Sequence, residues 1–286
     1  MSIEFGIDSI SYHTELRRGL SHTDLVRRVA STGASWLLID EEYAEHLSDS
    51  ERRQVKSASD DASLRLLYSG RNIGGATSDL RAELEHLAHK WIDVAEDFDS
   101  SFLRVHSSWY GTDLIGDDVA VANEDAYIVD ACQILAEIAA SRGTTVAIEN
   151  HSNLTSQRWQ EIVAPLYGTG MAMFLDLANG PGMFERPGHA VQVLGPISIG
   201  GHVKNLNVTS RENPDDSYYR TGFEFTWTLP SQGVLPVGRL LHELEGMVKE
   251  RDFPLLIEAL FPVESSHDLD TIYRDELAHL REIAQQ

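Results

Sequence analysis

The sequence predicts an α/β fold, a single (β/α)8 TIM barrel that forms one domain over residues 1–286. Short runs rich in apolar and β-branched residues alternate with longer amphipathic runs, as expected for parallel strands connected by helices. Several of the short runs are almost wholly apolar, which is typical of strands buried on both faces. The alternation gives eight strand–helix pairs that exhaust the chain, and this favours a closed barrel over an open sheet.

The eight expected strands cover residues 3–10, 36–40, 64–69, 102–107, 145–150, 171–177, 198–205 and 255–259. The helices that follow them are expected at 21–31, 50–63, 78–97, 123–142, 156–166, 187–194, 236–251 and 267–284. The first helix carries signals at both ends, because Ser21 is followed three residues later by Asp24, and Gly33 lies just beyond its last residue.

The longest irregular segment is expected at about 209–232, after the seventh strand. Active sites of such barrels lie at the carboxyl ends of the strands, so this long loop is a candidate lid or substrate contact. Its aromatic residues are more numerous than a solvated loop requires. They either cover the site or contact another subunit, and we favour the subunit contact. They are Tyr218, Tyr219, Phe223, Phe225 and Trp227.

The acidic composition restricts the partners. The chain has 45 Asp and Glu against 23 Lys and Arg, a formal net charge of -22, which would repel a polyphosphate or an anionic membrane. Hydrophobic residues make up 42% of the chain, enough for a sizeable core. We therefore expect a small-molecule substrate, with neither nucleic acid nor a membrane as partner.

Other features concern the compartment and the cofactor. The lone Cys132 cannot form an intramolecular disulfide, and we expect it to be a small buried residue in a reducing compartment. The first residues do not resemble a secretory signal, and no run approaches the roughly 18 to 20 apolar residues of a membrane span. A cytoplasmic enzyme is expected. No GxGxxG follows the first strand, and the glycines at 70–75 lack a phosphate-binding Lys-Ser/Thr, so nucleotide cofactors are not indicated.

Four successive strands end in residues suited to binding one hard cation. Glu149 lies in Val-Ala-Ile-Glu-Asn-His, Asp176 in Phe-Leu-Asp-Leu, His202 in Gly-His-Val-Lys and Glu258 in Leu-Leu-Ile-Glu. A single Glu in such a place could be a structural hydrogen-bonding group. The set of four favours a metal site, because three carboxylates buried together without a cation would repel one another.

Three carboxylates and one imidazole, without thiolates, suit Mn²⁺, Mg²⁺ or Co²⁺ better than a structural zinc ion, and we favour Mn²⁺. Such an ion can polarise a carbonyl and stabilise an enediolate. His151 follows Glu149 by two residues and would point to the same side of an extended strand. It is a candidate second base or hydroxyl ligand, with anchoring of the loop as the alternative.

Together these motifs resemble the xylose isomerase-like TIM barrel superfamily, in particular its sugar phosphate isomerase/epimerase branch, which includes ketose 3-epimerases and inosose dehydratases. The resemblance extends through all eight units, and its most specific parts are Ile148-Glu-Asn-His, Asp176, Gly201-His-Val-Lys-Asn and Ile257-Glu. It implies that the four strand-end residues bind the metal. It also implies that Glu149 and Glu258 form the acid/base pair that exchanges protons with a sugar or keto-sugar substrate.

One departure bears on the substrate. Ketose 3-epimerases usually carry a His three residues after the sixth-strand Asp, where this chain has Asn179, and their substrate-binding Arg after the seventh strand is not matched. Epimerisation of a free ketohexose is therefore not favoured. The catalytic subunits of C-glycoside deglycosidases are equally similar at the metal positions, and they act on 3-oxo-glycosides by proton abstraction followed by elimination.

The candidate substrate contacts each have a structural alternative. They are His106 at the end of the fourth strand, Asn179, Lys204 after the seventh strand, and Tyr12 and Trp109 after the first and fourth strands. The histidine could instead be half-buried, the lysine could pair with a carboxylate, and the aromatic residues could serve only as packing.

Three classes of function follow. We expect a metal-dependent isomerase or epimerase, with a lyase on 3-oxo-glycosides or a dehydratase as the alternative. An endonuclease of the same superfamily is disfavoured, because it needs a multinuclear centre and a basic surface that the charge of -22 opposes. A homo-oligomer is expected, or a hetero-oligomer with a small subunit if the chain is deglycosidase-like.

Overall fold

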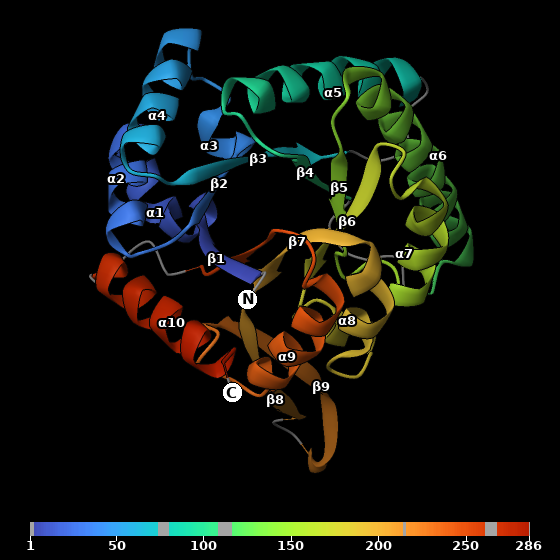
Figure 1. Cartoon of the computed structure of the whole chain (residues 1–286). Coiled ribbons are helices and arrows are strands. Elements are labelled where there is room, and N and C mark those ends of the chain that lie inside the picture. Colours follow the sequence, from blue (N-terminus) through green and yellow to red (C-terminus); the bar gives the residue numbers. More distant parts are fainter. Residues whose placement is uncertain (1–2, 74–79, 108–115, 214–215, 261–267, 286) are drawn as a thin grey trace.

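A closed barrel of eight parallel strands forms the centre of the protein (Figure 1). The computed structural model describes residues 3–73, 80–107, 116–213, 216–260 and 268–285. Around the barrel the strand order is β1-β10-β7-β6-β5-β4-β3-β2, which confirms the predicted fold class. The barrel strands are β1 (Ile3–Asp8), β2 (Trp36–Asp40), β3 (Arg65–Asn72), β4 (Leu103–His106), β5 (Val146–Glu149), β6 (Met171–Asp176), β7 (Ser198–Val203) and β10 (Phe253–Ile257).

Helices surround the barrel as an outer ring (Figure 1). The main ones are α2 (His22–Ser31), α4 (Asp49–Asp61), α5 (Leu80–Asp97), α6 (Asp118–Arg142), α7 (Ser156–Val163), α8 (His189–Leu194), α9 (Val237–Val248) and α10 (Leu269–Ile283). Each overlaps its expected range, and Ser21 caps α2 as predicted, its side chain accepting a hydrogen bond from the backbone N–H of Asp24. The sequence did not predict α1 (His13–Arg17) or α3 (Glu41–Ala44), because a single turn shows no helical periodicity.

Two apolar cores lie on the two sides of the barrel wall. The larger core fills the space between strands and helices, and it includes Cys132, whose thiol is buried as expected. The smaller core brings together side chains from strands around the barrel, namely Trp36, Leu38, Leu67, Phe102, Ala147, Phe174 and Leu256. Gly200 leaves room for it, because a Cβ there would lie 2.8 Å from the ring of Phe102 and 3.1 Å from that of Phe174.

The inner core determines where the polar residues point. Side chains alternate between the two faces of a strand, so the residue two positions further along also faces the interior. Two positions beyond six of the inner apolar residues the chain carries polar or charged side chains, namely Asp40, Ser69, Arg104, Glu149, Asp176 and Glu258. The carboxyl end of the barrel is therefore lined by charged and polar groups above an apolar floor.

The segment expected to be irregular at 209–232 is largely a β-hairpin. It comprises β8 (Asn205–Asn213) and β9 (Asp216–Thr228), which pair antiparallel and project beyond the ring of helices (Figure 1). The expectation of a loop was wrong because Phe223, Phe225 and Trp227 alternate with Glu224, Thr226 and Thr228, a period of two that is typical of a strand. The excursion still follows the seventh barrel strand, as predicted.

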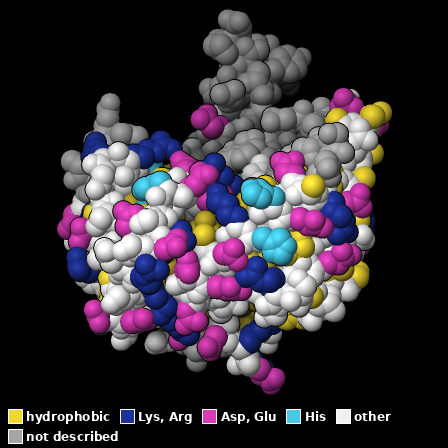
Figure 2. All heavy atoms as spheres, turned by 90° about the horizontal axis from the view of Figure 1, so that it is seen from above, with side chains coloured by type: hydrophobic (Ala, Val, Ile, Leu, Met, Phe, Trp, Pro, Cys, Tyr) yellow, Lys and Arg dark blue, Asp and Glu magenta, His cyan; other side chains and the backbone are white. Residues whose placement is uncertain are grey.

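The surface agrees with the acidic composition. On the face that Figure 2 shows, acidic side chains are interspersed with Lys and Arg, and the described residues there form no continuous basic stripe. Among the described residues, no helix has the length and apolarity needed to cross a membrane.

Candidate metal centre and active site

The four predicted ligands converge at the carboxyl end of the barrel. Glu149 and Asp176 are the last residues of β5 and β6, His202 lies in β7, and Glu258 directly follows β10. One side-chain ligand atom from each lies within 4.8 Å of the corresponding atoms of the other three. Glu149, Asp176 and His202 are 0% exposed, whereas the side chain of Glu258 is 16% exposed and so opens toward solvent.

His202 presents one ring nitrogen to the carboxylates. Its Nδ1 lies 3.4 Å from Glu149 Oε1, 3.8 Å from Glu258 Oε2 and 4.0 Å from Asp176 Oδ2. Its Nε2 lies 2.9 Å from Oδ2 of Asp8, at the end of β1. A proton on Nε2 would be donated to Asp8 and would leave Nδ1 free to bind a cation, which is the usual way that a carboxylate orients a metal-binding histidine.

One carboxylate oxygen of Glu149 forms an ion pair with a buried arginine on β4. Arg104 donates from Nε to Glu149 Oε2 over 2.9 Å and from Nη2 to the same oxygen, and its Nη1 donates to Ser69 Oγ over 2.8 Å. Burial alone would raise the pKa of Glu149, but the positive charges of Arg104 and His202 hold it well below its usual range. Because Oε2 is occupied by Arg104, Oε1 is the oxygen that faces the cluster.

Lys204 forms ion pairs with the other two carboxylate ligands, Asp176 and Glu258. Its Nζ lies 2.7 Å from Asp176 Oδ2 and also contacts Glu258 Oε2. Burial would raise the pKa of Glu258, but Lys204 and His202 lower it to about 2. For Asp176 burial prevails over the attraction of Lys204 and raises the pKa to about 6. Asp176 Oδ2 is buried and, despite the nearby ammonium, accepts no hydrogen bond of good geometry from the described residues.

The residues present fit a divalent cation. The described groups at the centre include five carboxylates, those of Asp8, Asp40, Glu149, Asp176 and Glu258, against the two permanent cations Arg104 and Lys204. This excess of negative charge raises the pKa of His202 to about 10, although burial alone would lower it, because Glu258 and Glu149 favour the imidazolium. A bound divalent ion would balance the charge and could also be coordinated by Asp176 Oδ2, which accepts no hydrogen bond of good geometry from the described residues.

A pair of histidines lies beside the ligands. His106 at the end of β4 and His151 after β5 stack with ring centroids 5.4 Å apart. Burial lowers the pKa of both, to about 3 for His106, and Arg104 adds to the effect in each case. Both imidazoles are therefore neutral at physiological pH and are weaker bases than a solvent-exposed histidine. His151 follows the ligand Glu149 by two residues, and its backbone N–H donates to the carbonyl of Glu149 over 2.9 Å.

The structure places the other predicted substrate contacts, Asn179, Tyr12 and Trp109, in different surroundings. Asn179 is buried and its Nδ2 lies 3.4 Å from Glu149 Oε1, while its backbone N–H donates to Asp176 Oδ1 over 3.1 Å. It therefore belongs to the centre. Tyr12 does not: it is 0% exposed, and its hydroxyl donates to Asp270 Oδ1 of α10 over 2.9 Å, so it serves packing rather than substrate contact. Trp109 lies outside the described residues.

Three charged residues of the centre were missed from the sequence. Asp8 and Asp40 end β1 and β2, and Arg104 lies within the buried strand β4. The available signal was the same as for the ligands, a charged side chain within or at the end of an apolar strand. The sequence does not show that Asp8 pairs with His202, because the two residues lie on β1 and β7, which are separated in the barrel by β10.

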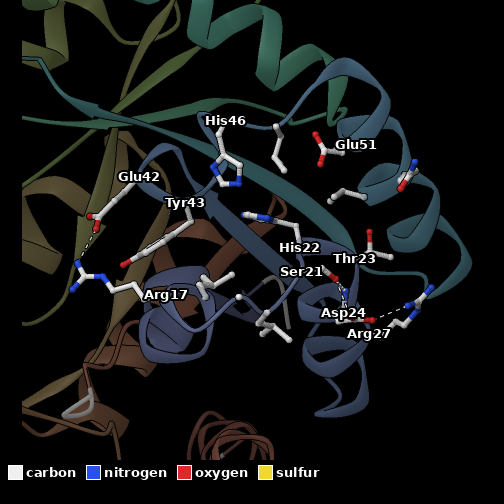
Figure 3. Close-up of a pocket in the computed structure, with 16 residues that line it drawn as sticks. Arg17, Ser21, His22, Thr23, Asp24, Arg27, Glu42, Tyr43, His46 and Glu51 are labelled. Atoms are coloured by element: carbon white, nitrogen blue, oxygen red, sulfur yellow. Dashed lines mark hydrogen bonds and ion pairs between the residues drawn. The ribbon is translucent and has the colours of Figure 1, made fainter. Parts of the chain in front are cut away.

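A separate cavity of about 610 Å³ lies among α1, α2, α3 and α4 (Figure 3). Figure 3 shows the imidazole of His22 pointing toward His46 and Tyr43, and the centroids of the two imidazole rings are 6.2 Å apart. None of the predicted metal ligands or substrate contacts lines this cavity. It is therefore distinct from the metal centre.

Comparison with known proteins identifies a family whose model matches this chain. The family model described as xylose isomerase-like TIM barrel matches residues 26–186, more than half of the chain. A comparison with curated proteins gave no match.

Solved structures resemble the whole barrel. The probable 3-DHS dehydratase AsbF from Bacillus anthracis has a TM-score of 0.73 at 17% identity, over 97% of this chain and 98% of that chain. A D-psicose 3-epimerase from Clostridium cellulolyticum H10, solved with D-tagatose, has a TM-score of 0.70 at 14% identity, over 98% and 99%. The 3-keto-D-glucoside 4-epimerase YcjR from E. coli gives the same TM-score, identity and shares. Likeness at these identities concerns the fold alone.

Proposed function

The chain belongs to the xylose isomerase-like TIM barrel family, and we propose that it is a divalent-metal-dependent isomerase or epimerase of a sugar or keto-sugar. The observation that carries the proposal is the convergence of Glu149, Asp176, His202 and Glu258 on one point at the open end of the barrel. Epimerases that act on sugars or keto-glycosides are among the proteins with this fold.

In the proposed reaction a proton leaves the carbon next to a carbonyl. It returns to the opposite face of the same carbon in an epimerase, or to the neighbouring carbon in an isomerase. An ion held by the four ligands would polarise that carbonyl as a Lewis acid and make the neighbouring proton more acidic. Glu258 is the more accessible of the two glutamates, and we assign it the first proton transfer, with Glu149 as its partner. Lys204 and Arg104 keep these two carboxylates ionised and therefore ready to accept a proton.

A lyase or dehydratase is the second candidate, and the paired histidines favour it. Elimination needs a group that donates a proton to the leaving oxygen or carbon, and the imidazole of His151, two residues after Glu149, is the candidate for that role. Asn179 replaces the histidine expected of a ketose 3-epimerase at this position. A probable dehydratase is also among the proteins with this fold.

Deuterium incorporation and product mass test the proposal. Metal-stripped protein would be incubated in D₂O with a panel of ketoses and 3-oxo-glycosides, with and without Mn²⁺. Exchange that depends on the metal and leaves the carbon skeleton unchanged supports the isomerase or epimerase. Metal-dependent release of water or of an aglycone makes the protein a lyase, and the absence of both reactions across the panel refutes the proposed chemistry.

The finer expectations remain proposals. The oxygen-rich ligand set supports Mn²⁺, with Mg²⁺ or Co²⁺ as alternatives. The cytoplasmic location, the single domain and the homo-oligomer, or its deglycosidase-like alternative with a small subunit, stay predictions from the sequence. An endonuclease is not supported, because the molecule has a formal net charge of -22 and the described residues on the face shown in Figure 2 form no basic stripe.

A further inference from the structure

The β8–β9 hairpin carries an apolar face that begins at the metal centre. Phe223, Phe225 and Trp227 lie on one side of β9, and Val208 of β8 is paired with Phe225 on the same side. Trp227 is at the inner end of this row, where Lys204 Nζ lies 4.8 Å from the centre of its ring. Because Lys204 also contacts Asp176 and Glu258, only one ammonium group separates the indole from the ligand cluster.

A cavity of about 590 Å³ adjoins the indole. Its apolar lining comes from Trp227 and Leu229 at the base of the hairpin, Ala259 and Leu260 after β10, and Ile272 of α10. Ala259 directly follows the ligand Glu258 in sequence, and Trp227, which lines the cavity, also contacts Lys204 of the metal centre. Trp227 is 41% exposed and Leu260 is 57% exposed, which is a large apolar area to leave uncovered beside a polar site.

The charges around this cavity exclude an anionic group. Neither Lys nor Arg is among the described residues that line it, and it carries the two carboxylates of Asp275 and Glu276. At the centre itself Lys204 and Arg104 are already paired with carboxylates. A phosphate on the substrate would therefore meet negative charge here without a free cation, whereas an uncharged ring would bury apolar surface.

We propose that this cavity binds a flat, uncharged, apolar substituent of the substrate, so that the enzyme acts on an aryl-substituted sugar rather than on a sugar phosphate. The proposal rests on the proposed function, since it assumes that the sugar itself is held at the metal centre. Trp227 provides the stacking surface, and the aliphatic side chains opposite it close the pocket. Trp227 links the cavity to the metal centre, because its ring also contacts Lys204.

Binding of a simple aromatic probe tests this subsite without any turnover. Phenol and phenyl β-D-glucopyranoside would be titrated into the wild type, Trp227→Ala and Phe223→Ala, with affinity measured by ligand-observed NMR or calorimetry. Phe223 is a matched control, because it lies on the same face of the same strand but at the outer end, 63% exposed. We expect Trp227→Ala to weaken both probes about tenfold, and Phe223→Ala to change neither.

Three results would overturn the subsite: no saturable binding of phenol at millimolar concentration, equal weakening by both variants, or tighter binding of glucose 6-phosphate than of phenyl glucoside. Failure of the proposed function would look different, because phenol binding does not require the metal. Tryptophan-dependent binding of phenol, together with no metal-dependent proton exchange, would sustain the subsite and refute the isomerase or lyase chemistry.

Discussion

Two buried histidines in this protein respond to burial in opposite ways. His22 on α2 is 6% exposed, its Nε2 has no hydrogen-bond partner among the described residues, and burial lowers its pKa to about 4. His202 is buried more completely, yet the surrounding carboxylates raise its pKa to about 10. Burial alone favours the neutral imidazole, so the reversal at His202 reflects the excess of negative charge in the barrel. That excess is what a divalent cation would relieve.

The largest effect is expected from removing the acid/base groups. Glu258→Gln and Glu149→Gln keep the side-chain volume but remove the charge that accepts a proton, and each should lower turnover by about 10²- to 10⁴-fold. Circular dichroism would show that the fold is retained, and steady-state kinetics on whichever substrate of the ketose and 3-oxo-glycoside panel reacts would measure the loss. Glu250→Gln on the surface is the matched control. Full activity in either active-site variant would remove that residue from its proposed role.

Binding of the metal should stabilise the fold and should depend on His202. At a free Mn²⁺ concentration of about 100 times Kd, ligand linkage adds about 2.7 kcal/mol, which for a chain of this size raises Tm by roughly 5 to 10 °C. In His202→Gln the shift should largely disappear, because one of four ligands is lost. Differential scanning calorimetry with and without the metal measures both values. An equal shift in wild type and variant would place the ion elsewhere.

The four ligands could be predicted from sequence because each is a charged residue at the end of an apolar strand in successive units. Asp8 and Asp40 follow the same rule, but their roles depend on which strands face each other across the barrel, and local sequence does not contain that information. The β8–β9 hairpin was mistaken for a loop because its polar content outweighed its alternation. Tyr12 was assigned to the substrate from its position after β1, whereas the turn that follows β1 directs its side chain toward α10.

A smaller effect on metal affinity is expected at Asp8, which orients His202. Asp8→Asn keeps an oxygen that can cap the turn after β1, where Asp8 Oδ1 accepts from the backbone N–H of Ile10 over 2.9 Å. It removes the charge that holds the Nε2 proton of His202, so Mn²⁺ should bind about 10- to 100-fold more weakly. Isothermal titration calorimetry gives the affinity, and a separate thermal melt without metal gives the fold's own stability. Unchanged affinity would contradict the positioning role.

The smallest effect concerns His22 and isolates the contribution of burial. The unfolded chain protonates a histidine near pH 6.5, whereas folded His22 does so only near pH 4. Its contribution to stability is therefore complete above pH 6.5 and is lost as the pH falls toward 4, with a slope of at most about 1.4 kcal/mol per pH unit. His22→Gln cannot be protonated, so its free energy of unfolding, measured by urea titration at pH 7, 6 and 5, should fall less steeply than that of the wild type. The same substitution at His242, exposed on α9, controls for the loss of any histidine. If His22→Gln and the wild type lose stability in parallel, the orphaned ring nitrogen of His22 is already compensated, and the contrast with His202 would then rest on the carboxylate cluster alone.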